Sequence, residues 1–230
     1  NLPGITVSLK FTPQALAGIY LGKITRWNDP AIARANRGVR LPNEKIITVH
    51  RSDGSGTTFM WTNYLSKVSP EWKQKVGSNT SVDWPVGLGA KGSEGVSGTV
   101  EQTPYSIGYD ELIYALQNHI LYGSIENRDG KFIKATLESV TAAAAADASS
   151  IQHDIRTPIT DAPGAGSYPV SSFTYLLAPA TMSNTAKETA IKGFLHWMLT
   201  DGQKDAEPLG YAPLPQSVVT IETGMIDQIQ

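Results

Sequence analysis

The chain has 230 residues, of which 40% are hydrophobic and 17% are charged, a composition typical of a packed globular protein and not of a disordered one. Its formal net charge of −2 excludes the strongly basic balance of most nucleic-acid-binding proteins. The absence of cysteine excludes disulfides, thiol nucleophiles and thiolate metal sites, and it fits an oxidising compartment. No apolar run approaches the roughly 20 residues of a membrane-spanning helix.

The first half of the chain alternates short apolar segments with helix starts. Residues 5–10 alternate loosely, as a strand does, and Thr12 followed by Pro13 marks the start of a helix. We expect the next elements in this order: a second capped helix after Asp29, a buried strand at 46–49, a helix over 59–65 and a third capped helix after Ser69. The segment 51–57 then lies between a predicted strand and a predicted helix.

The second half continues this alternation. After a Gly- and Ser-rich stretch at 87–98, we expect these elements: a strand at 105–109, a helix capped by Asp110, an alanine-rich helix around 142–146, a loop over 161–172, a strand at 173–177, a long helix over 190–198 and a last helix after Gln216. Strands that alternate with helices along the whole chain predict the α/β fold class.

The loop from Arg51 to Thr57 carries residues suited to bind an anion. The first turn of a helix has backbone N–H groups without an intrahelical partner and partial positive charge, so it attracts anions without any lysine. Two glycines let the backbone bend and approach a ligand, and the hydroxyls of Ser55 and Thr57 are donors. Arg51 presents two parallel N–H donors, and Asp53 is close enough to pair with it. The same residues also fit an ordinary capped junction of strand and helix, and on their own they do not decide between the two.

Several further segments resemble one protein family. They are residues 16–27 (LAGIYLGKITRW), 84–92 (WPVGLGAKG), 107–109 (IGY) and 209–215 (LGYAPLP). Together with the loop 51–57, and in this order along the chain, they resemble the substrate-binding protein of the high-affinity phosphate (Pst) ABC transporters. The resemblance runs from about residue 1 to about residue 225.

This resemblance implies a two-lobed periplasmic binding protein fold of type II, in which two chain crossings link the lobes and the ligand is buried between them. It implies that residues 1–168 form the second lobe and residues 169–230 the returning part of the first lobe. It also implies that Arg51, Ser55, Gly56 and Thr57 bind the ligand and that Asp53 orients the arginine.

The function implied is capture of inorganic phosphate and its delivery to the membrane subunits of an ABC transporter. The expected place is the periplasm or the outer face of the cell membrane. We expect a monomer that binds no nucleic acid, needs no cofactor or metal and has no catalytic residue.

Members of this family carry an N-terminal segment before the position of Asn1, and it supplies ligand contacts that include a carboxylate. We therefore expect one lobe to be incomplete here and Asn1 to follow from processing or truncation. A carboxylate accepts a hydrogen bond only from an anion that carries a proton, so it rejects sulfate. Without it, we expect this chain to lose discrimination between phosphate and sulfate.

Other functions remain open at the level of sequence. The site could serve another tetrahedral oxyanion such as sulfate or molybdate. A phosphoryl-processing enzyme would need a base such as His50 next to Ser55, and residues 87–93 fail the spacing of a phosphate-binding P-loop. A pure interaction module would expose the five tryptophans, which we instead expect to pack in the core: Trp27, Trp61, Trp72, Trp84 and Trp197.

Overall fold

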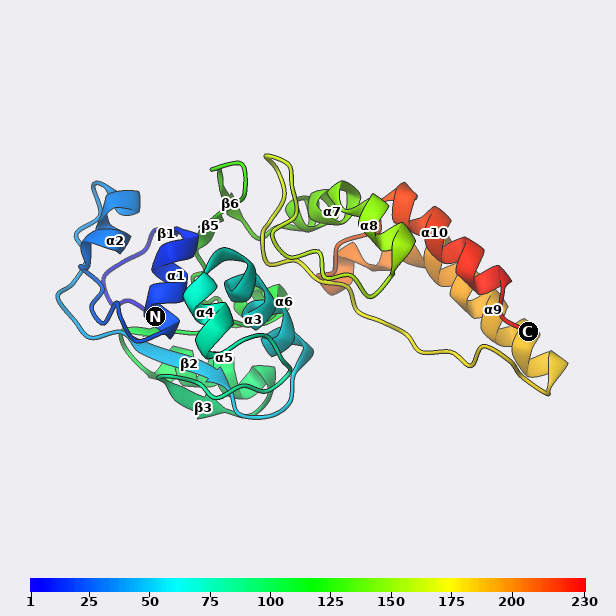
Figure 1. Ribbon diagram of the computed structural model, residues 1–230, viewed down its shortest axis with the longest axis horizontal. Coiled ribbons are helices and arrows are strands. Elements are labelled where there is room, and N and C mark those ends of the chain that lie inside the picture. The colour runs from blue at the N-terminus through cyan, green and yellow to red at the C-terminus, as the bar shows by residue number, and fades with distance from the viewer.

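The computed structural model describes residues 1–230 as an elongated molecule with an N-terminal body and a C-terminal group of helices (Figure 1). The strands are β1 (Lys10–Phe11), β2 (Ile47–Arg51), β3 (Leu88–Ala90), β4 (Ser106–Ile107), β5 (Ser124–Glu126) and β6 (Phe132–Lys134). The α-helices are α1 (Pro13–Tyr20), α2 (Pro30–Ala33), α3 (Gly56–Val68), α4 (Pro70–Lys75), α5 (Gly92–Gln102), α6 (Leu112–Gln117), α7 (Leu137–Ala146), α8 (Ala148–His153), α9 (Thr185–Leu199) and α10 (Gln216–Asp227). Short 3₁₀ turns are η1 (Arg34–Asn36), η2 (Asp201–Asp205) and η3 (Glu207–Leu209).

Three helices begin where the capping residues predict. Thr12 caps α1, because its Oγ1 accepts a hydrogen bond from the backbone N–H of Ala15. Asp29 and Ser69 cap α2 and α4 with their side-chain oxygens in the same way. The predicted cap of α6 is wrong, because that helix begins one residue later and Glu111 precedes it. Asp110 is thereby left outside the helix and near the end of β4.

The sheet that matters for function has the order β3-β2-β4, and both pairings are parallel. Parallel strands point the same way, so the chain leaves all three at the same edge. β2 lies in the centre, with Val49 fully buried, and α5 packs against it. A second sheet of order β1-β5-β6 pairs β1 with β5 in parallel and β5 with β6 as an antiparallel hairpin.

The main core lies between α1, α3, α4 and the second sheet. It contains 16 buried residues, among them Trp27, Trp61 and Trp72, and Trp84 packs against it. The prediction that the tryptophans are core residues is confirmed for these four. It is wrong for Trp197, which is 46% exposed because it lies on α9, a helix with no buried residue.

The C-terminal helices form a smaller group. α9 and α10 lie side by side, and α10 also contacts α7 and α8 (Figure 1). Their core is four buried residues, Ala144, Ile151, Ile159 and Val218. The boundary between two lobes at residue 168 stays a prediction, since α7 and α8 precede that residue and α10 follows it.

The strand expected at 173–177 is wrong. This segment is extended but pairs with no strand, and Leu177 is 98% exposed. Its β-branched and aromatic character fits a strand, yet a strand forms only where a neighbour supplies the ladder of hydrogen bonds. The long helix around 190–198 and the last helix after Gln216 are both confirmed as α9 and α10.

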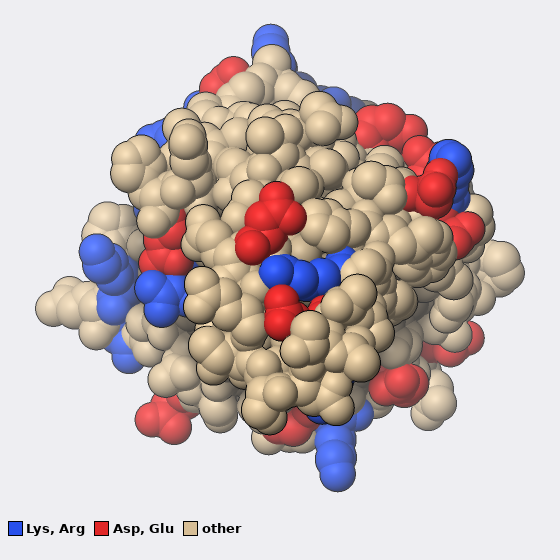
Figure 2. Space-filling view, turned by 90° about the vertical axis from the view of Figure 1, so that its right-hand side faces the viewer, with Lys and Arg blue, Asp and Glu red and all other residues tan.

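The surface at the end of the molecule formed by α9 and α10 mixes both charge signs (Figure 2). Blue and red side chains are scattered among neutral ones, and neither sign gathers into a broad patch. None of the ten α-helices combines the length and apolar character needed to cross a bilayer.

Candidate anion-binding site

Arg51 is the last residue of β2, the central strand of the parallel sheet. In open sheets of this kind, ligands bind beyond the carboxyl ends of the strands, where the loops leave for the helices. Its side chain is 13% exposed, so the guanidinium is held close against the protein and still reaches solvent. The predicted loop therefore lies at the edge of the sheet where a ligand is expected.

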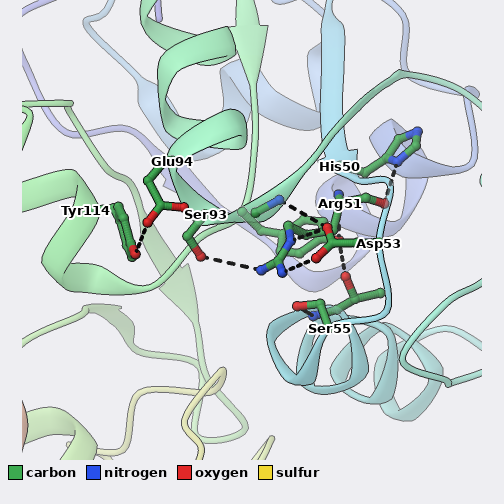
Figure 3. A network of polar contacts seen from close by, with 10 residues as sticks. His50, Arg51, Asp53, Ser55, Ser93, Glu94 and Tyr114 are labelled. Carbon is green, nitrogen blue, oxygen red and sulfur yellow. Dashed lines mark hydrogen bonds and ion pairs between the residues drawn. The ribbon is translucent and has the colours of Figure 1, made fainter.

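Asp53 holds the guanidinium of Arg51 in one orientation (Figure 3). Nε of Arg51 donates to Oδ1 at 2.8 Å, and Nη2 donates to Oδ2 at 2.6 Å. The backbone N–H of Gly92 donates to the same Oδ1 at 3.1 Å, which holds the aspartate in turn. These bonds to Arg51 keep the pKa of Asp53 well below its usual range, so the carboxylate stays ionised. The predicted pairing of the two side chains is confirmed.

The N-terminus of α3 leaves a small set of free donors next to Arg51. Ser55 caps the helix, and its Oγ accepts from the backbone N–H of Thr58 at 3.2 Å. The N–H of Ser55 itself donates to Thr80 O at 2.9 Å. The amides of Gly56 and Thr57, at the first two helical positions, have no partner within the helix. Two backbone N–H groups and the hydroxyls of Ser55 and Thr57 are thus the donors that this end of the helix offers.

The glycines of the loop act differently from what the sequence suggests. Neither Gly54 nor Gly56 has a left-handed backbone, so neither is needed for a sharp turn. A Cβ atom at either position would meet nothing within 4 Å. The missing side chains therefore leave open space in front of the helix amides, where an anion can approach closely.

A cavity of about 1070 Å³ opens in front of this loop. Arg51, Ser55, Gly56 and Thr57 all line it, so the structure brings the four predicted ligands together at one surface. Tyr211, from the C-terminal part of the chain, lines the same cavity. The predicted ligands therefore face space that both parts of the molecule enclose.

Several residues of this site were missed at the level of sequence. Tyr109 is 7% exposed, its hydroxyl lies 2.6 Å from Thr58 Oγ1, and it accepts from the backbone N–H of Arg51 at 3.2 Å. Nη1 of Arg51 points to Ser93 Oγ at 3.4 Å. Their neighbours Glu94 and Tyr114 bond to each other at 2.9 Å and tie α5 to α6 (Figure 3).

A signal for these residues was present. Ser93 follows the strand β3, and Tyr109 and Asp110 follow the strand β4. In a parallel sheet, the segments after both strands begin beside the loop after β2. The strand order β3-β2-β4 therefore places these three residues at the same edge of the sheet as Arg51. That order is a tertiary property, and no local pattern in the sequence contains it.

His50 does not act on Ser55. Its ring stacks on Trp84, with centroids 4.6 Å apart and planes 14° from parallel, and its Nδ1 lies 3.1 Å from Arg51 O. Side chains alternate along a strand, so His50 and Arg51 point to opposite faces of β2 (Figure 3). Burial lowers the pKa of His50 and favours its neutral form. The residues proposed for a phosphoryl-processing enzyme are therefore not brought together.

Comparison with known proteins agrees with this geometry. Residues 5–202 match the family described as the PBP superfamily domain. A phosphate-binding protein PstS of Xylella fastidiosa (strain Temecula1) is 49% identical over 211 residues, which cover 92% of this chain and 58% of that protein. PstS of Pasteurella multocida is 46% identical over 220 residues, which cover 95% of this chain and 64% of that protein. Both names describe binding and neither describes catalysis.

The solved structure of a high affinity periplasmic phosphate-binding protein, PfluDING, superposes with a TM-score of 0.65 at 17% identity and supports the fold alone. The match covers the whole of this chain and 66% of PfluDING. The chain spans about three fifths of the length of the two PstS relatives. The predicted α/β binding-protein fold and the resemblance to Pst substrate-binding proteins are both confirmed. The chain therefore belongs to the PBP superfamily and is a homologue of PstS phosphate-binding proteins.

Proposed function

We propose that this chain binds inorganic phosphate at the edge of the β3-β2-β4 sheet. Arg51, Ser55, Gly56 and Thr57 contact the anion, and Asp53 orients the arginine. The observation that carries the proposal is the placement of an oriented guanidinium beside the free amides at the start of α3, on one wall of a cavity.

The donors suit a tetrahedral oxyanion. Asp53 accepts from Nε and one N–H of Nη2, and Ser93 Oγ accepts from one N–H of Nη1, so one N–H on each Nη of Arg51 is left for the ligand. The helix end adds two amides and partial positive charge. No lysine is required, which agrees with the net charge of −2 for the chain.

The wider role follows from the same relatives. We infer that the site lies between two lobes, residues 1–168 and 169–230, and that the whole protein releases phosphate to the membrane subunits of an ABC transporter. We place this activity in the periplasm or at the outer face of the cell membrane. The presence of Arg51 and Tyr211 around one cavity supports a site enclosed from two sides.

Calorimetric titration with inorganic phosphate tests the proposal. Wild-type chain should bind, and Arg51→Lys should bind at least about tenfold more weakly, because an ammonium group cannot contact Asp53 and the anion as a planar fork does. Arg26→Lys is the matched control: Arg26 donates to Asn43 O at 2.9 Å at an exposed site outside the cavity, and its exchange should leave the affinity unchanged.

Three results would contradict the proposal. Absence of phosphate binding by the wild-type chain would reject the function. Equal affinity of Arg51→Lys and wild type would reject the site. Tighter binding of sulfate or molybdate than of phosphate would assign the same site to another oxyanion.

A further inference from the structure

The hydroxyl of Tyr109 joins the two ends of the anion loop. It accepts from the backbone N–H of Arg51, the last residue of β2, at 3.2 Å. It also lies 2.6 Å from Oγ1 of Thr58, which belongs to the first turn of α3. Arg51 and Thr58 share no direct hydrogen bond. A hydroxyl from the segment after β4 is therefore the link between the strand end and the helix start.

This link lies in the interior of the protein. Tyr109 is 7% exposed and Thr58 is 1% exposed. A tyrosine hydroxyl carries one proton and two lone pairs, which is enough for both contacts. Burial raises the pKa of Tyr109, so the hydroxyl keeps its proton. Because little water reaches these groups, a partner left without the hydroxyl would remain unsatisfied at a cost in free energy.

Aromatic contacts hold the ring of Tyr109 in place. It stacks on Trp61 of α3, with centroids 5.5 Å apart and planes 14° from parallel. Trp84 stacks on the same ring at 5.7 Å and 27°, and Tyr20 of α1 lies at 6.2 Å and 55°. Pairs at such separations stabilise one another beyond the area that they bury. The ring is thus fixed from several sides, and the position of its hydroxyl is fixed with it.

Other hydrogen bonds of the loop connect it to neighbouring segments. The backbone N–H of Ser52 donates to Ala90 O, and that of Ser55 donates to Thr80 O, both at 2.9 Å. Neither bond runs from the end of β2 to the start of α3. The hydroxyl of Tyr109 is the hydrogen-bonded group that touches both.

The donors of the proposed site lie at both ends of this link. Arg51 supplies the guanidinium from the strand end, and the amides of Gly56 and Thr57 directly precede Thr58 in the helix. A tetrahedral anion has to reach both sets of donors at hydrogen-bonding distance. The spacing between strand end and helix start therefore determines how many donors one anion can use.

We propose that Tyr109 is a positioning residue of the anion site, which holds the end of β2 against the first turn of α3 and so sets the distance between the Arg51 guanidinium and the helix amides. This inference rests on the proposed phosphate site. Tyr109 lines the cavity, but its hydroxyl is engaged within the chain and acts on the anion through Arg51 and Thr58. Without the hydroxyl, the two ends of the loop can shift apart, and binding has to restore their spacing.

Calorimetric titration of Tyr109→Phe with inorganic phosphate tests this role. The exchange keeps the ring and removes the hydroxyl, and the affinity should fall about tenfold, the size expected for one buried hydrogen bond. Tyr64→Phe is the matched control. Tyr64 is fully buried on α3, also contacts the ring of Trp61, has a hydroxyl without a partner and does not line the cavity. Its exchange should leave the affinity unchanged.

Variants of Thr58 test the link from its other end. Thr58→Val keeps the shape of the side chain and removes the hydroxyl, so it should weaken phosphate binding. Thr58→Ser keeps the hydroxyl and should bind as wild type. The double variant Tyr109→Phe/Thr58→Val should bind no more weakly than Tyr109→Phe alone, because both exchanges remove the same link. Hydrogen exchange at the amide of Arg51 should be faster in Tyr109→Phe than in wild type.

Several results would overturn this inference and leave the proposed function intact. One is phosphate binding by Tyr109→Phe that equals that of wild type. Others are equal losses in Tyr109→Phe and Tyr64→Phe, or additive losses in the double variant, which would assign the effect to the core in general. If Tyr109→Phe does not fold, equal binding by Thr58→Val and Thr58→Ser would overturn the inference. Failure of the wild-type chain to bind phosphate would overturn both.

Discussion

The guanidinium of Arg51 and the carboxylate of Asp53 meet at two points, Nε to Oδ1 at 2.8 Å and Nη2 to Oδ2 at 2.6 Å. A two-point contact between planar groups fixes the plane of the arginine as well as its position. The backbone N–H of Gly92 holds the aspartate from a separate segment of the chain. The arginine is thereby oriented before any ligand arrives, which reduces the entropy lost on binding.

Exchange of Asp53 for asparagine should weaken phosphate binding. An asparagine side chain presents one acceptor and one NH₂ group, so one of the two contacts with Arg51 would be lost and the guanidinium would be free to rotate. We expect the affinity to fall about tenfold, measured by calorimetric titration. Asp201→Asn is the control, because Asp201 forms an ion pair with Lys204 at 2.7 Å and neither residue lines the cavity. An equal loss in both variants would show that the effect is not specific to the site.

Exchange of Gly56 for alanine should weaken phosphate binding without lowering the free energy of unfolding. Gly56 begins α3, and a Cβ atom there meets nothing within 4 Å, so the free energy of unfolding should stay the same or rise by up to about 1 kcal/mol. The added methyl group would stand in the space before the helix amides, and phosphate affinity should fall about tenfold. Gly224→Ala, in the exposed part of α10 with the same open space, should leave the affinity unchanged. Urea unfolding and calorimetry on the same samples measure both quantities.

Because the pKa of Asp110 is raised, the free energy of unfolding should depend on pH. Burial raises this pKa from the ordinary 3.8 to about 6 in the folded chain, so the folded state holds the proton more tightly than the unfolded state. The resulting stabilisation is complete below about pH 4 and is lost as the pH rises through about 6. Asp110→Asn should remove a decrease on the order of 1 kcal/mol over this range, a size reduced by solvent screening of a partly exposed group. Urea unfolding at pH 4, 6 and 8 checks this, and identical pH profiles for the two proteins would contradict it.

Local features of the fold could be predicted well from sequence. Thr12, Asp29 and Ser69 cap helices because a capping side chain bonds to backbone atoms two or three residues away, and such contacts do not depend on the rest of the chain. The prediction of a strand at 173–177 was wrong because a strand needs a pairing partner, which can lie far away in the sequence.

The same difference between local contacts and contacts among distant segments applies to the site. The sequence by itself determined that Arg51 and Asp53 pair and that a helix begins after Ser55, since both relationships span only a few residues. Only the tertiary structure decided that the segment after β3 and the segment after β4 join them, because the order β3-β2-β4 sets which loops meet at one edge. Gly92 bonds to Asp53 across 39 residues of chain, and Asp110 comes from still further along the sequence. Their approach depends on the packing of whole strands, and that is why an acidic group beside the anion loop was not foreseen from local pattern.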